Sequence, residues 1–326
     1  MSLDIILGML GPVSLPSLAT MPTIPSCATP PQQPRAVVQP GKGMGIACAL
    51  LVVALFSGFT LVSRLGFTRS PLTLPDIAAL RFGVAGLLML PVLWHYGLRG
   101  LALRRAILLA FLGGLGFALF AYAGFLMAPA SHSAALLHGT LPLTTFLAAM
   151  LLTGAKAGAA KRLGLALIGI GVAAMAWDSL LGASSRQLLG DAALVCASLC
   201  WSFYAVTARR LGLAPAHAAA IVAVLSCLAY LPFYAMLPDK ALWTADWQDI
   251  LIQAGFQGVL LGVVSIFVYT QAVASLGAQE TALFTAAVPC LTTVLAVAVL
   301  GEMPSTPAWM GVAVVTAGMA VALRGK

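Results

Sequence analysis

Long apolar stretches separated by short polar segments make up most of the chain from residue 44 onward. A helix needs about 20 mostly apolar residues to cross the hydrocarbon layer of a membrane. The pattern therefore predicts an all-α integral membrane protein with ten transmembrane helices, over residues 44–63, 77–96, 106–127, 131–152, 162–179, 188–208, 216–237, 250–273, 279–300 and 305–323.

One segment of this pattern occurs twice. Ser131–Gly154 reads SHSAALLHGTLPLTTFLAAMLLTG, and Ala278–Gly301 reads AQETALFTAAVPCLTTVLAVAVLG. At a constant offset of 147 residues, Pro142 aligns with Pro289 without a gap. A duplicated hydrophobic unit with a proline in mid-helix is how many carriers build a site at the membrane midplane.

The duplication divides the chain into two five-helix repeats, residues 44–179 and 188–323. Because five is an odd number, the second repeat enters the membrane in the opposite sense, which predicts an inverted repeat. Residues 1–43 hold eight of the 19 prolines and few charges, and we expect them to form a disordered cytoplasmic tail or to precede the true start of translation near Met44.

Composition supports a lipid-facing surface. Of the 326 residues, 61% are hydrophobic and 8% are charged, whereas soluble domains have about 25% charged residues. The net charge of +8 does not indicate nucleic-acid binding, because the basic residues lie in short clusters between apolar runs. Most of them fall in loops on one side, which predicts that both termini are cytoplasmic and that the protein lies in the inner membrane.

The aligned prolines are the first candidates for function. Proline has no N–H, so the carbonyl four residues earlier loses its helical partner. Those carbonyls belong to His138 and Thr285, and Gly139 makes the fourth span less regular still. We expect Pro142 and Pro289 to form paired kinks that line a central cavity, or otherwise to shape packing.

Several side chains are candidates for the cavity wall. His138 could bind a substrate or exchange a proton, or bond to a neighbouring helix as a neutral ring. Arg81 could anchor a carboxylate or phosphate, form a structural hydrogen bond, or extend to the interface. The aligned Tyr122 and Tyr269, with Trp201, suit amphipathic solutes, or serve packing and an interfacial belt.

Two polar residues lie near the predicted cytoplasmic end. Gln271 adds a polar group near Tyr269 in the eighth span, and Glu280 begins the ninth span as a gate or as a plain helix N-terminal charge. Glycines spaced by seven residues in the fifth and tenth spans should let these helices pack closely or form a dimer contact. The pattern of Cys, His and acidic residues indicates no metal site and no cofactor.

The sequence resembles the drug/metabolite transporter superfamily, with two EamA-type domains over about residues 44–323. The residues that carry the resemblance are Ala79-Leu80-Arg81-Phe82, Ser133–Pro142, Gly190-Asp191, Ala274-Ser275-Leu276-Gly277-Ala278, Ala287-Val288-Pro289 and Leu300-Gly301-Glu302. The resemblance implies ten helices in an inverted repeat, a central cavity and movement of small metabolites, often as export.

Two positions depart from the pattern of that family. The fourth span ends in Thr153-Gly154-Ala155, so the glutamate of the usual Leu-Gly-Glu ending is missing, whereas Glu302 retains it in the second repeat. His138 stands where related sequences have a small residue or proline. It is therefore a candidate for what is particular to this protein.

Three functions follow as hypotheses. The first is a secondary transporter that uses alternating access to move a small organic metabolite, amino-acid-like or amphipathic, with export as the expected direction. The second is a membrane enzyme, against which the chain shows no DxxD or HxxxH cluster. The third is a non-transporting scaffold or lipid-handling protein. The partners expected are a small-molecule substrate and the lipid bilayer, with a monomer or homodimer as the assembly.

Overall fold

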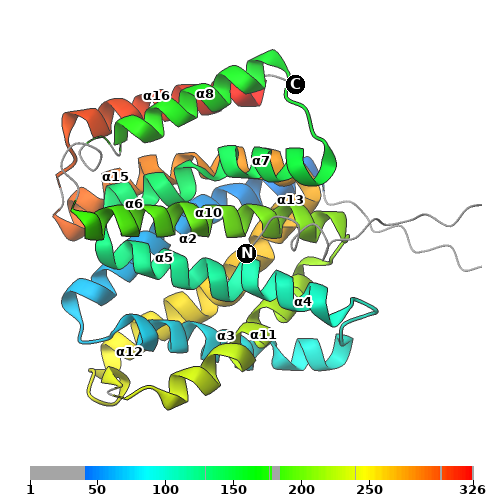
Figure 1. The fold of residues 1–326 in the computed structure, drawn as a ribbon, viewed down its shortest axis with the longest axis vertical. Coiled ribbons are helices and arrows are strands. Elements are labelled where there is room, and N and C mark those ends of the chain that lie inside the picture. Colours follow the sequence, from blue (N-terminus) through cyan, green and yellow to red (C-terminus); the bar gives the residue numbers. More distant parts are fainter. Residues whose placement is uncertain are drawn as a thin grey trace, which may run out of the picture.

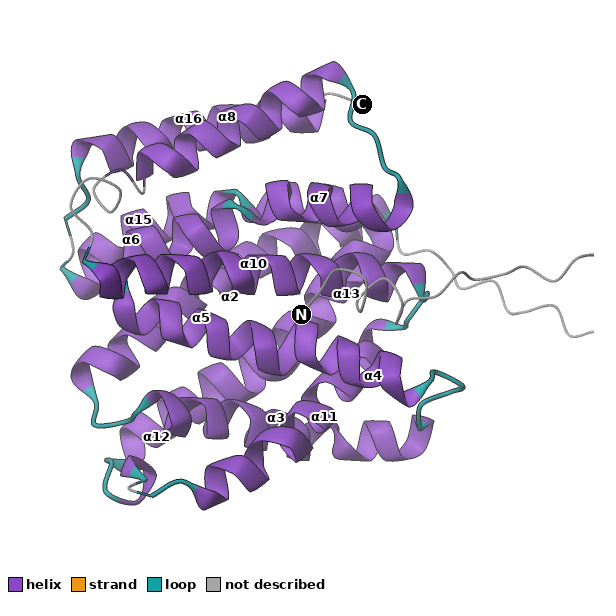
Figure 2. Cartoon of the chain, in the orientation of Figure 1, coloured by secondary structure: helices purple, strands orange, loops and turns teal. Residues whose placement is uncertain are grey.

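The computed structural model describes residues 41–128, 130–175, 177, 184–238, 240–301 and 303–324. These residues form helices and connecting loops, and no strand occurs among them (Figure 2). The predicted tail, Glu302 and the end of the predicted fifth span lie outside the described residues, apart from Gly41, Lys42, Gly43 and Trp177.

The first repeat holds five helical spans. In chain order they are α2 (Lys42–Arg69); α3 (Leu74–Tyr96); α4 (Leu103–Ala110) continuing through η1 (Phe111–Leu115) into α5 (Gly116–Met127); α6 (Ala130–Ala134) with η2 (Ala135–Gly139) followed by α7 (Leu141–Thr153); and α8 (Ala159–Met175). Helix α2 begins two residues before the predicted first span.

The second repeat follows the same order. Its elements are α10 (Ser185–Arg210); α11 (Pro215–Met236); the short η3 (Ala241–Trp243); α12 (Trp247–Gln253) continuing through η4 (Ala254–Val264) into α13 (Ser265–Leu276); α14 (Ala278–Thr285) followed by α15 (Ala287–Leu300); and α16 (Thr306–Arg324). Among the described residues, nine helical spans are long and apolar enough to cross a membrane, and α8, with 17 described residues, is the remaining predicted span.

Large apolar side chains cover the outside of these helices. On α3, for example, Leu87 is 68% exposed and Trp94 is 87% exposed. Such a surface is stable in lipid rather than in water. The all-helical fold, the apolar spans and the two repeats together identify an integral membrane protein.

The contacts between the two repeats are symmetric. Each helix of one repeat packs either on its own counterpart in the other repeat or in a contact that has an equivalent with the two repeats swapped. Helix α3 packs on its counterpart α11, and α8 on its counterpart α16. The contact of α2 with α13 is mirrored by that of α10 with α5, and the contact of α2 with α15 by that of α10 with α7. Figure 1 shows the α8–α16 pair at one end of the long axis and the α3–α11 pair at the other.

The glycines spaced by seven residues explain the α8–α16 contact. A Cβ atom on Gly311 would lie 2.5 Å from the carbonyl oxygen of Gly171, and one on Gly164 would lie 2.5 Å from Cβ of Ala322. These glycines therefore let the two backbones touch within one chain.

Two π-helical segments occupy aligned positions in the third and eighth spans. At the offset of 147 residues, η1 falls inside η4. π-Helical turns are rare and are frequent at functional sites. Gly113 in η1 lies against the ring of Tyr204, where a Cβ atom would be 2.6 Å from Cδ2. The π-helical turn η1 thus lies against α10, whereas Gly258 and Gly262 of η4 lie against α3.

Candidate functional site

The fourth and ninth spans are each broken just before their proline. Thr140 separates η2 from α7, which has Pro142 at its start, and Ala286 separates α14 from α15, which has Pro289 in its first turn. The missing N–H of each proline explains why the regular helix does not continue. The two breaks are adjacent, because a Cβ atom on Gly139 would lie 3.1 Å from Cγ of Pro289.

His138 lies at the first break and is completely buried. Its ring centroid is 4.8 Å from that of Phe56 and 6.4 Å from that of Phe59, both on α2. Neither ring nitrogen has a hydrogen-bond partner among the described residues. A buried polar group normally has a partner, so this ring is available to a ligand rather than tied to a neighbouring helix.

Aromatic side chains from four helices surround this position. We call Phe56, Phe59, Phe117, Tyr122, His138, Trp201, Tyr204 and Tyr269 the central cluster. The ring of Trp201 is the hub, with centroid distances of 4.6 Å to Phe117, 4.9 Å to Tyr269 and 5.5 Å to Phe56. The indole Nε1 of Trp201 and the hydroxyl of Tyr269 also lack hydrogen bonds of ordinary geometry to the described residues.

Arg81 lies at the edge of the central cluster. Its guanidinium carbon is 5.2 Å from the ring centroid of Phe59 and 5.8 Å from that of Phe117. Only 2% of the residue is exposed, so the expectation that it could extend to the interface is wrong. A cation–π contact contributes about 0.5–2 kcal/mol, whereas desolvating an ion costs several kcal/mol. The rings alone therefore do not offset burial of the charge.

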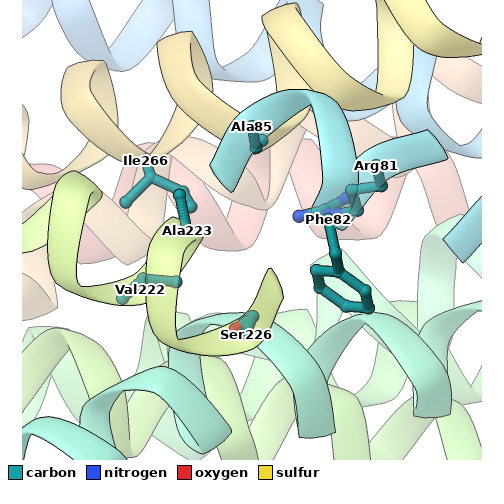
Figure 3. A pocket seen from close by; sticks show the side chains of 9 residues that line it. Arg81, Phe82, Ala85, Val222, Ala223, Ser226 and Ile266 are labelled. Carbon is teal, nitrogen blue, oxygen red and sulfur yellow. The ribbon is translucent and has the colours of Figure 1, made fainter. Parts of the chain in front are cut away.

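The helix that carries Arg81 is fixed at its start. The Asp76 carboxylate accepts hydrogen bonds from the backbone N–H of Thr73 (2.9 Å) and from the hydroxyl of Tyr234 on α11 (2.6 Å). The first is part of a capping box that begins α3. Beside Arg81, between α3, α11 and α13, is a cavity of about 10 Å³, enough for about one water, and Figure 3 shows the side chains that line it.

A chain of buried hydrogen bonds connects Tyr122 to the eighth span. The Tyr122 hydroxyl donates to Oε1 of Gln257 (3.1 Å), whose Nε2 donates to Oγ of Ser63 (2.9 Å). Gln253, one turn before, donates to the carbonyl of Val62 (3.0 Å). Sequence reasoning missed both glutamines. The signal that could have found them is two amides four residues apart on one face of an apolar helix.

Hydroxyl groups join α7 to α10 close to the first break. Ser202 bonds Thr144 (2.7 Å) and Thr145 (2.9 Å), and Ser198 bonds Thr144 (3.0 Å) and Thr140 (2.8 Å). Sequence reasoning also missed this group. Because Ser202 follows Trp201 directly, these bonds fix α7 against the helix that carries the hub of the central cluster.

A second cavity, of about 300 Å³, lies at the end of the molecule that is predicted to be cytoplasmic. We call it the basic vestibule; it is lined by Ala149, Thr153, Lys161, Val206, Arg209, Arg210, Leu276, Gly277, Ala278, Gln279 and Glu280. Three of these residues are cationic and one is anionic. Lys161 donates to Oε1 of Gln279, and Arg209 donates to the carbonyl of Val273.

The remaining predicted residues take different places. Glu280 lies in the first turn of α14, at the vestibule. Thr285 is buried, and its hydroxyl donates to the carbonyl of Ala282 (2.7 Å) in its own helix. Gln271 is half-buried on α13, and the ring contacts described for the central cluster do not include it. Its place at the site stays a prediction.

Comparisons with known proteins agree with this architecture. A model of the EamA-like transporter family matches residues 43–177 and 188–324, which are the two repeats. A solved structure described as "Crystal structure of protein" has 21% identity and a TM-score of 0.60, covering 86% of this chain and 98% of that one. At this identity the likeness concerns the fold alone. A comparison with curated proteins gave no match.

Proposed function

Since the chain belongs to the EamA-like transporter family, a family of membrane transporters rather than enzymes, we propose that it is a secondary carrier that moves a small organic metabolite across the cytoplasmic membrane by alternating access. The solute would be amino-acid-like or amphipathic, and export is the proposed direction. Both termini would be cytoplasmic, and the two repeats would be inverted.

The observation that carries this proposal is the contact between the two helix breaks. Gly139 of the first repeat lies against Pro289 of the second, beside the buried His138, whose ring nitrogens have no hydrogen-bond partner among the described residues. Broken helices at the midplane of paired repeats are a common construction for a carrier site. Movement of one half-helix must be accommodated by the other, so exchanging the conformations of the repeats would open the site to one side and close it to the other.

The symmetry of the helix contacts between the two repeats supports the same mechanism. Because each contact across the centre has a counterpart, the two conformations would have similar packing energies. A carrier needs this near balance, since the solute can shift the equilibrium only by its difference in affinity for the two states. The basic vestibule supports access from the cytoplasmic side in the conformation described.

The test uses a cysteine at the centre and needs no knowledge of the solute. In a variant with its native cysteines replaced, Thr285→Cys would be labelled with a membrane-impermeant maleimide in right-side-out and in inside-out vesicles. A carrier should be labelled from both sides, at rates below those of exposed positions. Protection from both sides, or labelling from one side only, would contradict alternating access.

Two control positions calibrate the labelling. Thr153→Cys lies at the vestibule and should react only from the cytoplasmic side. Met303→Cys is 80% exposed at the opposite end of the ninth span and should react only from the other side. The same two controls test the proposed orientation, because reversed labelling of both would reverse the topology.

A further inference from the structure

Besides the ring nitrogens of His138, three polar groups left unsatisfied at the centre can donate hydrogen bonds. Arg81 Nη1, Trp201 Nε1 and the hydroxyl of Tyr269 are buried without a hydrogen bond of ordinary geometry to a described residue. The Trp201 and Tyr269 groups lie close enough to interact with each other, and the Tyr269 hydroxyl then still has its own proton to donate. The Arg81 and Trp201 groups can only donate. A ligand that satisfies this set must therefore present acceptor atoms.

The positive charge of Arg81 favours an anionic ligand, which also supplies acceptor atoms. Arginine stays ionised in proteins, and Arg81 forms no ion pair with a described Asp or Glu. The acidic residue that precedes it on α3, Asp76, already uses its oxygens on Thr73 and Tyr234. The hydroxyl of Tyr122 interacts with the guanidinium but carries no compensating charge. An intramembrane cation without a counter-ion is a strong indication of a binding site.

The aromatic part of the site sits next to this cation. Phe59 contacts both Arg81 and His138, and Phe117 contacts both Arg81 and Trp201. A solute with an acidic end at Arg81 would thus place its remainder among the rings of the central cluster. The rings could also hold an organic cation, but the charge of Arg81 opposes a cation at this position.

From these observations, and on the basis of the proposed function, we infer that the transported solute carries a carboxylate, that Arg81 binds it, and that the central cluster holds its apolar part. The fork of the guanidinium matches the two oxygens of a carboxylate. The basic vestibule is consistent with this substrate class, because Lys161, Arg209 and Arg210 would attract an anion to the cytoplasmic opening. In the conformation described, the space beside Arg81 holds about one water, so binding requires the site to open.

The test uses four probes that share one aromatic ring and differ in charge. Purified full-length protein in detergent is titrated with 3-phenylpropionate, phenylalanine, 3-phenylpropan-1-ol and 3-phenylpropylamine, and the shift of the unfolding midpoint gives the affinity. The two carboxylates should stabilise the protein saturably, and the alcohol and the amine should not. Stabilisation by the amine or the alcohol equal to that by the acid, or no stabilisation by either carboxylate, overturns the inference.

Variants of Arg81 test whether this residue binds the carboxylate. Arg81→Gln should weaken carboxylate binding at least about tenfold, as expected for loss of a charge-assisted bond, and Arg81→Lys should retain part of it. Arg69→Gln removes an exposed arginine at the end of α2, where its guanidinium donates to the carbonyl of Val299, and should leave the affinity unchanged. Equal affinity in Arg81→Gln and the unchanged protein contradicts the assignment. If Arg81→Gln does not fold, the comparison among the four probes still decides.

Failure of this inference and failure of the proposed function give different results. Labelling of Thr285→Cys from both sides without carboxylate binding keeps the carrier and removes the substrate class. Carboxylate binding through Arg81 without labelling from both sides keeps the anion site and removes alternating access.

Discussion

Gly139 and Pro289 meet at the centre of the molecule, each at the helix break of its own repeat. A Cβ atom on Gly139 would lie 3.1 Å from Cγ of Pro289 and 2.9 Å from Cγ2 of Val172. Contacts this close leave little room for any side chain. The residue therefore allows two interrupted helices from different repeats to touch where His138 is buried.

Gly139→Ala should disturb this contact. Overpacking a close-packed site costs about 1–3 kcal/mol, so we expect a lower unfolding midpoint and slower labelling of Thr285→Cys from one side. Gly169→Ala on α8 is the matched control, because its Cβ would make only an ordinary contact, 3.6 Å from Leu143 Cδ1. Equal behaviour of the two alanine variants would show that the contact tolerates a side chain and does not constrain the exchange.

Pro142→Ala should slow the exchange between conformations. The new N–H can pair with the carbonyl of His138 and join η2 to α7. A backbone hydrogen bond contributes about 0.5–1.5 kcal/mol, so labelling rates of the central cysteine should fall about two- to tenfold with little loss of stability. Pro91→Ala removes an exposed proline from α3 and should leave the rates unchanged. Normal rates in Pro142→Ala would count against a hinge.

Much of the fold can be predicted from the sequence because membranes impose a simple length and hydrophobicity rule on each span. The family match confirms the resemblance and the two repeats. The burial of Arg81 is a feature that hydropathy does not predict. A predicted start at residue 77 put Arg81 about one turn from the interface, but the capping box at Thr73 begins α3 at Leu74 and adds most of another turn. Capping lengthens the helix, and packing against Phe59 and Phe117 buries the charge; hydropathy detects neither.

Contacts between distant segments were the other limit. His138 and the aligned tyrosines could be proposed because they interrupt or repeat the apolar pattern. The hydrogen-bond partner of Tyr122 could not be proposed, because Gln257 lies 135 residues away in the sequence. Ser63, which Gln257 bonds in turn, lies 194 residues from Gln257. A single sequence states which residues are polar, and tertiary packing decides which of them meet.

His138 should affect ligand binding more than stability. His138→Leu removes both ring nitrogens, whereas His138→Asn keeps a polar group in the same place. With the strongest ligand found among amino acids, nucleosides, sugars, polyamines and aromatic amphiphiles, we expect at least about a tenfold weaker affinity for the leucine variant and a smaller loss for the asparagine variant. His95→Ala, exposed at the far end of α3, should bind normally. Unchanged affinity in His138→Leu would remove this residue from the site.

Gly311→Ala should separate α16 from α8. Its Cβ would lie 2.5 Å from the carbonyl oxygen of Gly171 and 2.9 Å from the backbone nitrogen of Met175, and backbone cannot move aside as a side-chain end can. We expect a loss of stability of about 1–3 kcal/mol or more, measured as the unfolding midpoint. Gly255→Ala in η4 meets nothing within 4 Å and should be neutral or stabilising. A neutral Gly311→Ala would mean that the α8–α16 contact is not close-packed.

Tyr122 and Gln257 should act as one unit. Gln257→Leu leaves the Tyr122 hydroxyl and Ser63 without their partner inside the membrane, which should cost about 1–3 kcal/mol. Tyr122→Phe removes the donor and leaves Gln257 still bonded to Ser63, but it also removes the hydroxyl that interacts with the Arg81 guanidinium, so its loss includes that contact. Because both changes remove the same hydrogen bond, the double variant should lose less stability than the sum of the two single losses. The four unfolding free energies form a double-mutant cycle. Strict additivity would show that the bond contributes nothing, and that the glutamine acts on stability through Ser63 or Gln253 alone.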